Sequence, residues 1–436
     1  MDRHKTPARA ARGITRRTLP ALALIATIAL GAGASDWTQF RGPGQDGIAN
    51  ATGLPATWDD TANIAWKTPL PGPGGSSPIV VGDRVFLTSY SGYAESIENP
   101  GNMEDLMRHV VCLDRATGKV IWQKDFKAKM PESAYVGGNN TRHGYASSTP
   151  TSDGESLFVF FGKSGVFSFD LDGNERWTAD VGEGTDGWGS ATSPVLHNNL
   201  LIVNAGVESG ALIALDKATG QAVWRAGDVS RTWATPVLVE AGGRTEAVLN
   251  LPGKVAAYDA ETGKALWHCE GIPDSYVCPS VIAHDGVVYA IGGRRSQVMA
   301  VRAGGSGDVT GSHILWRTEK GNNVTSAVLV DNHLYWFHES RGVAYCANAA
   351  TGEIVYEENL EPRPGLIYAS ITVADGKLYA TSQDNGTYVV AAKPEFEQIA
   401  VNTFASDSSR VNASIAVDRG QLLLRTDRAI YCIGNK

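Results

Sequence analysis

A nine-residue unit, D-x-x-T-G-x-x-x-W, recurs along the chain and restricts the possible folds more than any other feature. The clearest copies are residues 114–118 with Trp122, 216–220 with Trp224, and 259–263 with Trp267. Weaker copies end at Trp177 and Tyr356. In each copy Asp opens a turn, Gly takes the positive φ, and a new strand starts. The aromatic ring then packs at the same place in every repeat.

Eight segments of small residues and Pro precede apolar β runs and set the period of the chain. Their last residues are Pro78, Pro150, Pro194, Pro236, Ser280, Ala327, Ile371 and Ser414, with steps of 72, 44, 42, 44, 47, 44 and 43. A period in the low forties with four short strands is typical of a propeller. We therefore predict an all-β fold, an eight-bladed β-propeller of four-stranded antiparallel blades, over residues 63–436.

The two ends of the chain are expected to share one blade. Trp66 looks like the last strand of a unit that lacks its first three strands, whereas residues 414–433 contain three strand runs and then stop. An N-terminal strand that joins the C-terminal blade would close the ring and remove its free edges. Residues 35–62 would form an N-terminal arm. The aromatic side chains expected to dock between blades are Trp66, Trp122, Trp177, Trp224, Trp267, Trp316 and Tyr356.

The first 34 residues have a different composition. Six basic residues precede an apolar run over residues 19–30, and small residues stand at 32–34. This order predicts a signal peptide that is cleaved after Ala34, with a run too short for a stable membrane span. The protein is then exported, to the periplasm or the extracellular space. The pair Arg16-Arg17 leaves both the Sec and the twin-arginine route open.

Charge and cysteine content narrow the choice of partners. Without the leader the chain would carry 32 basic and 45 acidic residues, a net charge of about −13, because six basic residues and one acidic residue are lost. Such a charge argues against nucleic acid as a partner. We expect a monomer. Of five cysteines, Cys269 and Cys278 flank one loop and could pair or remain free.

One face of the predicted ring carries varied polar and aromatic residues, whereas the turns of the other face are generic. Aromatic, Arg and Asn side chains that converge on a central funnel suit a ligand site, although they could also satisfy one another across blades. We assign no catalytic residue and no metal ligand, because no motif for either is present. The candidate ligand-binding residues are Arg142, His143, Lys163, Trp188, Glu208, Arg231, Trp233, Tyr276, Arg294, Asn322, His338 and Tyr368.

These repeats, with the strand starts and the leader, resemble the pyrroloquinoline quinone (PQQ)-like β-propeller repeat of quinoprotein dehydrogenases. The opening Trp37-Thr-Gln-Phe40-Arg41-Gly42-Pro43 resembles the start of a secreted group common in planctomycete-type bacteria. Quinoprotein alcohol dehydrogenases bind PQQ and Ca²⁺ beside an adjacent Cys-Cys disulfide, which this sequence lacks. The propeller lipoprotein of the BAM complex is similar in size and blade count, and binds other proteins without a cofactor.

The resemblance implies two functions. We expect a non-catalytic binding or scaffold propeller, with no cofactor, that holds a protein segment, a glycan or a small molecule on the funnel face. The alternative is a PQQ- and Ca²⁺-dependent dehydrogenase that oxidises an alcohol or a sugar. In that case the quinone would lie on a Trp ring and the cation would polarise its carbonyl.

Overall fold

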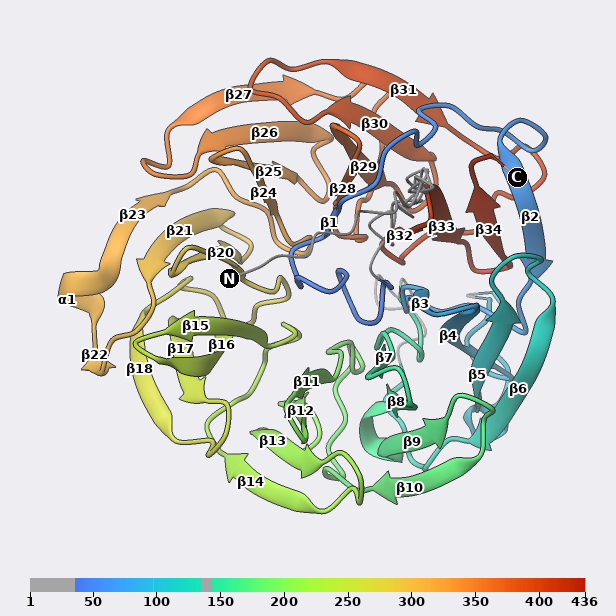
Figure 1. Cartoon of the computed structure of the whole chain (residues 1–436), viewed down its shortest axis with the longest axis horizontal. Helices are drawn as coiled ribbons and strands as arrows, with labels where there is room; N and C mark the ends of the chain where they lie inside the picture. The colour runs from blue at the N-terminus through green and yellow to red at the C-terminus, as the bar shows by residue number, and fades with distance from the viewer. Residues whose placement is uncertain (1–35, 97, 135–142, 436) are drawn as a thin grey trace, which may run out of the picture. The chain divides into compact units, whose positions relative to one another are not determined.

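The computed structural model describes residues 36–96, 98–134 and 143–435. In this part of the chain the strands form eight sheets arranged as the blades of a ring (Figure 1). The expected leader, residues 1–34, lies outside the described residues. The all-β, eight-bladed prediction is confirmed, and each sheet contains the four antiparallel strands that the repeat period indicated.

In each of the first four blades the chain runs from the innermost strand outward. Blade 1 comprises β3 (Ile79–Val81), β4 (Arg84–Ser91), β5 (Met107–Asp114) and β6 (Val120–Lys127). Blade 2 comprises β7 (Thr151–Ser152), β8 (Ser156–Phe160), β9 (Val166–Asp170) and β10 (Glu175–Ala179). Blade 3 comprises β11 (Val195–His197), β12 (Leu200–Ala205), β13 (Ala211–Asp216) and β14 (Ala222–Ala226). Blade 4 comprises β15 (Val237–Ala241), β16 (Arg244–Leu251), β17 (Lys254–Asp259) and β18 (Ala265–Glu270).

The remaining blades follow the same order. Blade 5 comprises β19 (Ile282–His284), β20 (Val287–Gly292), β21 (Gln297–Arg302) and β23 (Ile314–Thr318). Blade 6 comprises β24 (Val328–Val330), β25 (His333–Phe337), β26 (Val343–Asn348) and β27 (Ile354–Asn359). Blade 7 comprises β28 (Thr372–Ala374), β29 (Lys377–Thr381), β30 (Thr387–Ala391) and β31 (Gln398–Asn402). Blade 8 comprises β32 (Ala416–Asp418), β33 (Gln421–Arg425), β34 (Ala429–Ile433) and β2 (Ile64–Pro69).

Short elements lie outside this pattern. Strand β1 (Ile48–Ala49) pairs in parallel with β28, and β22 (Gly307–Asp308) pairs in parallel with β18. Helix α1 (Thr310–His313) and the 3₁₀ turns η1 (Met103–Asp105) and η3 (Gly162–Ser164) lie in loops. The apolar core is divided among the spaces between adjacent blades. Between blades 4 and 5, for example, Val255, Trp267, Val288 and Met299 pack together.

The ring is closed by the N-terminal strand, as the sequence predicted. Strand β2 pairs antiparallel with β34, with Trp66 opposite Cys432 and Pro69 opposite Ala429. The fourth strand of blade 8 therefore comes from the start of the chain. Because β2 occupies the outer position of blade 8, the first and last parts of the propeller are held together by a backbone ladder.

The D-x-x-T-G-x-x-x-W unit joins neighbouring blades through its Gly and the Trp of the blade before. In blade 3, the Asp216 carboxylate accepts from the N–H and the hydroxyl of Thr219, both at 2.9 Å, and these bonds lower the pKa of Asp216. Gly220 has φ +74°, and a Cβ there would lie 2.5 Å from the Trp177 ring. The indole Nε1 of Trp177 donates to the carbonyl of Lys217 at 3.0 Å. The indole ring of one blade thus packs directly against the turn of the next blade.

Four other expected docking residues behave in the same way. Their indole N–H groups donate to a carbonyl of the next blade's turn at 2.9–3.2 Å: Trp66 to Arg115, Trp122 to Leu171, Trp224 to Ala260, and Trp316 to Ala349. Trp267 instead donates to Glu246 of its own blade at 2.6 Å, because an insertion replaces this turn in blade 5. Tyr356 lies edge-on to Phe396, with ring centroids 5.5 Å apart.

The N-terminal arm crosses the middle of the ring, which Figure 1 shows as the blue segment that leads to β1. Its carbonyl groups accept from the inner strands of several blades. Trp37 O accepts from Val80 at 2.9 Å, and Gly47 O accepts from Val373 at 2.8 Å. These partners are the middle residues of β3 and β28. The arm is therefore hydrogen-bonded to the inner strands and is part of the propeller.

All five cysteines are free thiols, so Cys269 and Cys278 are not joined. Cys269 lies in the outer strand β18 and Cys278 lies beside the channel. Burial raises the pKa of the Cys278 thiol to about 12. A thiol with such a pKa is protonated at neutral pH and is a poor nucleophile.

Candidate binding cavity on the funnel face

The inner strands are held together by a closed ring of hydroxyl groups. Just before or at the start of each inner strand, one Ser or Thr accepts the backbone N–H of its equivalent in the preceding blade, at 2.9–3.1 Å. The last blade returns to the first, since Ser414 N donates to Ser77 Oγ. We call this set the hydroxyl ring: Ser77, Thr149, Ser193, Thr235, Ser280, Ser326, Ser370 and Ser414.

A cavity of about 170 Å³, open to solvent, lies above this ring on the face where the inner strands begin, which we call the funnel face. Six members of the hydroxyl ring lie in its wall. The loops that lead into the inner strands supply aromatic side chains to the same wall, and the N-terminal arm supplies one more. These residues are His143, Trp188, Trp233, Tyr276, Tyr368 and, from the arm, Phe40.

The aromatic side chains are held by contacts between loops of different blades. The rings of His143 and Trp188 are stacked, with centroids 6.2 Å apart and planes 12° apart. Trp233 donates from Nε1 to the carbonyl of Gly189 at 2.7 Å and meets Tyr276 edge-on. Because these contacts fix the ring planes, the wall is pre-organised for a flat or apolar group.

The wall of the cavity carries little charge. Burial lowers the pKa of His143 to about 4, so its imidazole is neutral at pH 7. Within the described residues, the wall includes no Asp, Glu, Lys or Arg side chain. Its polar groups are hydroxyls, the amides of Asn323 and Asn412, and the thiol of Cys278. The arrangement can stack on a ring and exchange hydrogen bonds, but it offers no strong counter-charge.

Five of the twelve predicted ligand-binding residues therefore meet in this cavity: His143, Trp188, Trp233, Tyr276 and Tyr368. Arg142 lies outside the described residues. The other six occupy different positions on the same face. The sequence grouped them because they precede inner strands or follow second strands, but the position of a residue along the chain does not show how far its loop reaches toward the axis.

Lys163 and Glu208 are buried behind the wall. Lys163 Nζ donates to the carbonyl of Pro131 at 3.0 Å. Glu208 is 4 % exposed and accepts a hydrogen bond from Ser190. Burial, with a contribution from the Glu132 carboxylate, raises the pKa of Glu208 to about 7. The carboxyl group therefore titrates near neutral pH. It does not line the cavity.

Asn322 and His338 are also buried. Asn322 Oδ1 accepts from the N–H of Val324 at 3.0 Å. His338 Nδ1 lies 3.3 Å from the N–H groups of Ser340 and Arg341 and 3.2 Å from the Glu339 carboxylate, and its Nε2 lies 3.4 Å from Ser296 Oγ. Burial lowers the pKa of His338.

The two remaining arginines lie at the exposed rim. Arg231 Nε donates to the carbonyl of Ser275 at 2.8 Å. The guanidinium of Arg294 lies 5.2 Å from the centre of the Tyr276 ring, and its Nε donates to the Tyr276 hydroxyl at 3.3 Å. Asn323 donates to the same hydroxyl at 2.8 Å. Arg294 therefore orients one aromatic residue of the wall without entering the wall.

Sequence reasoning missed two contributions to the cavity. The first is Phe40, because the arm was not expected to reach the channel. The second is the hydroxyl ring, although its signal was present: the Ser and Thr residues recur at the same steps as the strand starts. Only the closed set of hydrogen bonds shows that these residues face the same channel.

A separate row of polar side chains lies in blade 1, away from the cavity wall. Ser91 Oγ is 2.7 Å from His109 Nε2, and His109 Nδ1 is 2.7 Å from Asp125 Oδ1. The order is that of a serine hydrolase triad. However, a Cβ on Gly72 would lie 2.0 Å from the carbonyl oxygen of Tyr90 and 3.5 Å from Ser91 Cβ, so the chain packs closely over this strand.

Comparison with known families agrees with this geometry. The family model described as outer membrane protein assembly factor BamB matches residues 107–358, more than half of the chain. The chain belongs to this BamB family. No curated protein matches the sequence. Within the described residues, no helix has the length and apolar character needed to cross a membrane.

Solved structures share the fold with this BamB-family chain. BamB from Moraxella catarrhalis is 15% identical, with a TM-score of 0.58, over 85% of this chain and 96% of that one. The computationally designed Ika8 protein is 14% identical, with a TM-score of 0.58, over 86% and 100%. A quinohemoprotein alcohol dehydrogenase, ADHIIG from Pseudomonas putida HK5, is 11% identical, with a TM-score of 0.55, over 92% and 81%. At these identities the likeness shows the fold alone.

Proposed function

We propose that this BamB-family propeller is a non-catalytic binding module that holds its ligand in the funnel cavity. The observation that carries the proposal is the wall itself, in which fixed aromatic rings and neutral hydrogen-bonding groups line a cavity of about 170 Å³ that is open to solvent. Such a wall suits an apolar or flat group that also carries a hydrogen-bond acceptor. A side chain or end of a partner protein, a glycan or a small neutral molecule has this chemistry.

PQQ with Ca²⁺ does not fit the described wall. The quinone carries three carboxylates, which need cationic partners, and Ca²⁺ takes six to eight oxygen ligands, usually including carboxylates. The described wall offers neither a Lys or Arg nor an Asp or Glu. In the described residues there is also no group of three or more His, Cys, Asp and Glu side chains placed to hold a metal. These features favour binding over quinone-dependent oxidation.

Export is part of the proposal. The basic and apolar order of residues 1–34 is that of a cleaved leader, which would place the protein in the periplasm or outside the cell. The family description, an outer membrane assembly factor, is compatible with that location and with a partner protein. We therefore expect the partner among exported or outer-membrane proteins.

Two experiments test the function. In the first, the purified mature protein is titrated calorimetrically with PQQ, with and without Ca²⁺, and then assayed for dye-linked oxidation of alcohols and sugars. We expect no binding and no turnover. Tight Ca²⁺-dependent binding with turnover would overturn the proposal and establish the dehydrogenase.

The second experiment compares capture from a periplasmic and outer-membrane extract by three forms of the protein. A Trp188→Ala, Tyr368→Ala double variant removes two faces of the wall, whereas Ile399→Ala changes an exposed residue of the outer strand β31. We expect one ligand to be retained by the wild type and by Ile399→Ala but lost by the double variant. Equal capture by all three would show that the cavity does not bind the partner.

A further inference from the structure

The cavity on the funnel face has the size of one small ring. Its volume is about 170 Å³, and it is open to solvent. An engineered apolar cavity of about 150 Å³ binds one benzene molecule. The funnel cavity therefore holds one six-membered ring, whose substituents can extend through the open mouth, rather than a longer segment of polypeptide.

The hydroxyl ring supplies this cavity with hydrogen-bond donors. Each of its oxygens accepts one backbone N–H, and none of the eight hydroxyls donates to an acceptor among the described residues. Six of the eight lie in the wall of the cavity. A hydroxyl that accepts one hydrogen bond retains its O–H donor and a second lone pair. The wall therefore favours an occupant that is rich in oxygen atoms.

Tyr276 adds a further donor to the wall. Its hydroxyl accepts from Asn323 Nδ2 at 2.8 Å and from Arg294 Nε at 3.3 Å, which together use both lone pairs. The Tyr276 O–H donates to no acceptor within the part of the chain that the structure describes. Since Tyr276 lines the cavity, this O–H is available to an acceptor on the occupant.

Aromatic rings give the same wall an apolar surface. Phe40, His143, Trp188 and Tyr368 all line the cavity, and each is only half-buried by the protein. The planes of His143 and Trp188 are 12° apart, and this stacking fixes the orientation of the indole. An accessible ring face of this kind packs against a flat or apolar surface. The occupant therefore carries an apolar face as well as its oxygen atoms.

The wall discriminates against charged groups and against purely apolar groups. Within the described residues it includes no Asp, Glu, Lys or Arg, so a carboxylate, phosphate or ammonium group would lose hydration without gaining a counter-charge. A hydrocarbon side chain would displace water from the hydroxyl ring and leave its O–H groups unpaired. A neutral pyranose avoids both costs, because its C–H face is apolar and each of its hydroxyls donates and accepts.

We propose that the funnel cavity binds one neutral pyranose residue of a glycan, with its C–H face on Trp188 and its hydroxyls against the hydroxyl ring and Tyr276. The inference rests on the proposed binding function and specifies its ligand. The rest of the glycan leaves through the open mouth of the cavity. A polysaccharide and a glycoprotein both carry such a residue, and the cavity recognises the sugar rather than its carrier.

Saturation-transfer NMR on the full mature protein tests the inference. The probes are the methyl glycosides of glucose, galactose, mannose and N-acetylglucosamine, with those of glucuronate and galacturonate as charged counterparts. We expect transfer from the protein to the ring C–H protons of at least one neutral glycoside, and affinity at least about tenfold weaker for a uronate than for its neutral sugar. No transfer to any neutral glycoside, or equal affinity for a sugar and its uronate, would overturn the proposal.

Three variants locate the binding. Trp188→Ala should abolish transfer, because it removes the ring on which the sugar lies. Tyr276→Phe keeps the aromatic ring but loses the O–H, and should weaken binding by about fivefold to tenfold. The matched control is Tyr388→Phe, which removes a buried hydroxyl that donates to the carbonyl of Pro362, outside the wall, and should leave the affinity unchanged. Unchanged binding in Trp188→Ala or in Tyr276→Phe would place the sugar elsewhere and overturn the proposal.

A peptide probe distinguishes failure of this inference from failure of the proposed function. N-acetylphenylalaninamide presents a neutral aromatic side chain between two amides. If it binds and loses binding in Trp188→Ala, while no neutral glycoside binds, the cavity holds a polypeptide group and only the glycan inference is wrong. If neither kind of probe binds and all three forms capture equally from the extract, the binding function itself is wrong.

The capture experiment also separates the two carriers of the sugar. Periodate cleaves the vicinal diols of sugars, so treating the extract with periodate should abolish retention by the wild type. Protease digestion of a second portion should then reduce a retained glycoprotein to glycopeptides and leave a retained polysaccharide unchanged. Retention that survives periodate would show that the ligand is not a sugar, and would overturn the glycan inference.

Discussion

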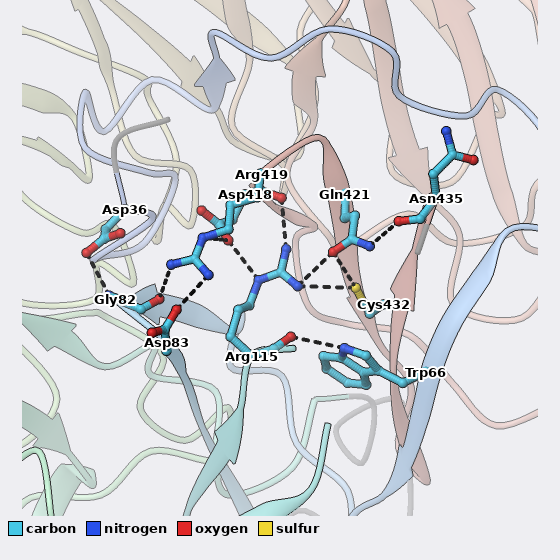
Figure 2. Close-up of polar contacts among 10 residues, drawn as sticks. All are labelled: Asp36, Trp66, Gly82, Asp83, Arg115, Asp418, Arg419, Gln421, Cys432 and Asn435. Atoms are coloured by element: carbon cyan, nitrogen blue, oxygen red, sulfur yellow. Dashed lines mark hydrogen bonds and ion pairs between the residues drawn. The ribbon is translucent and has the colours of Figure 1, made fainter. Parts of the chain in front are cut away.

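Arg115 of blade 1 forms a buried ion pair with Asp418 of blade 8, at 2.7 Å between Nε and Oδ2. Arg115 lies in the turn of the D-x-x-T-G-x-x-x-W unit, and its Nη1 also reaches Gln421 and Cys432 (Figure 2). The carbonyl of Arg115 accepts from Trp66 of the closing strand. One residue therefore binds both segments that form blade 8, and the pair lies where the two ends of the chain meet.

Removing one partner of this pair should weaken the closure. Asp418→Ala leaves the Arg115 charge buried and unpaired, so we expect the free energy of unfolding to fall by about 3–5 kcal/mol. Urea denaturation measures the change. The exposed Lys393–Glu397 pair is the control, and Glu397→Ala should cost less than about 1 kcal/mol. Equal small losses in both variants would contradict a structural role for the buried pair.

Two deletions distinguish the contribution of the closing strand β2 to stability from that of the arm. Deleting the mature chain up to Pro69 removes β2 and exposes the edge of β34, so we expect a strongly lowered Tm and aggregation. Deleting only up to Ala62 retains β2 but removes the arm, and should have a smaller effect. A melt unchanged by the longer deletion would refute closure by this strand.

Docking of the Trp ring on the turn predicts a difference between two glycines with nearly equal backbone angles. Gly220 and Gly253 have φ of +74° and +72°, but only at Gly220 would a Cβ strike a ring, that of Trp177, at 2.5 Å. Gly253→Ala should cost about 1 kcal/mol from backbone strain alone. Gly220→Ala adds a steric clash, so we expect about 1–3 kcal/mol more. Chemical denaturation that gives equal losses would mean that the turn moves away from the ring freely.

Glu208 should make stability fall as the pH rises through neutrality. Its pKa is raised to about 7 from an ordinary value near 4.5, so its contribution is fully present below about pH 4.5 and is lost above about pH 7. Glu208→Gln stays neutral. The stability of the wild type relative to this variant should therefore decrease by about 3 kcal/mol between about pH 4.5 and pH 8. A pH-independent difference in denaturation free energy would show that folding does not shift the pKa of this carboxyl.

The row Ser91–His109–Asp125 should be structural, in spite of its hydrolase-like order. Gly72 packs over this strand, and a Cβ placed there would be in van der Waals contact with Ser91, so we expect an acyl group at Ser91 to be hindered. A fluorophosphonate reagent should therefore not label the protein, as mass spectrometry would show. Labelling of Ser91 that disappears in His109→Ala would instead establish a nucleophile and an unexpected activity.

Much of the fold follows from local chemistry that is visible in the sequence. An Asp that accepts from a Thr three residues later, a Gly at positive φ and a Trp four residues after the Gly define one turn and one packed indole ring, as at Asp216, Gly220 and Trp224. These are short-range relationships, and their repetition fixes the number of blades. The incomplete first and last units even predict the closing strand, because a propeller cannot leave a blade unfinished.

The site depends on distances that no spacing encodes. Trp188 and Lys163 both follow strands on the funnel face, yet one lines the cavity and the other is buried behind it, because loop path and packing decide how far a side chain reaches. Phe40 lines the cavity, and Arg41 donates to the carbonyl of Ala327 almost 300 positions away, only because the arm crosses the ring. The sequence determined the repeating framework through local turns and periodic packing. Only the tertiary structure determines which side chains lie together at the axis of the propeller, because their distances depend on how blades and arm pack over long sequence separations.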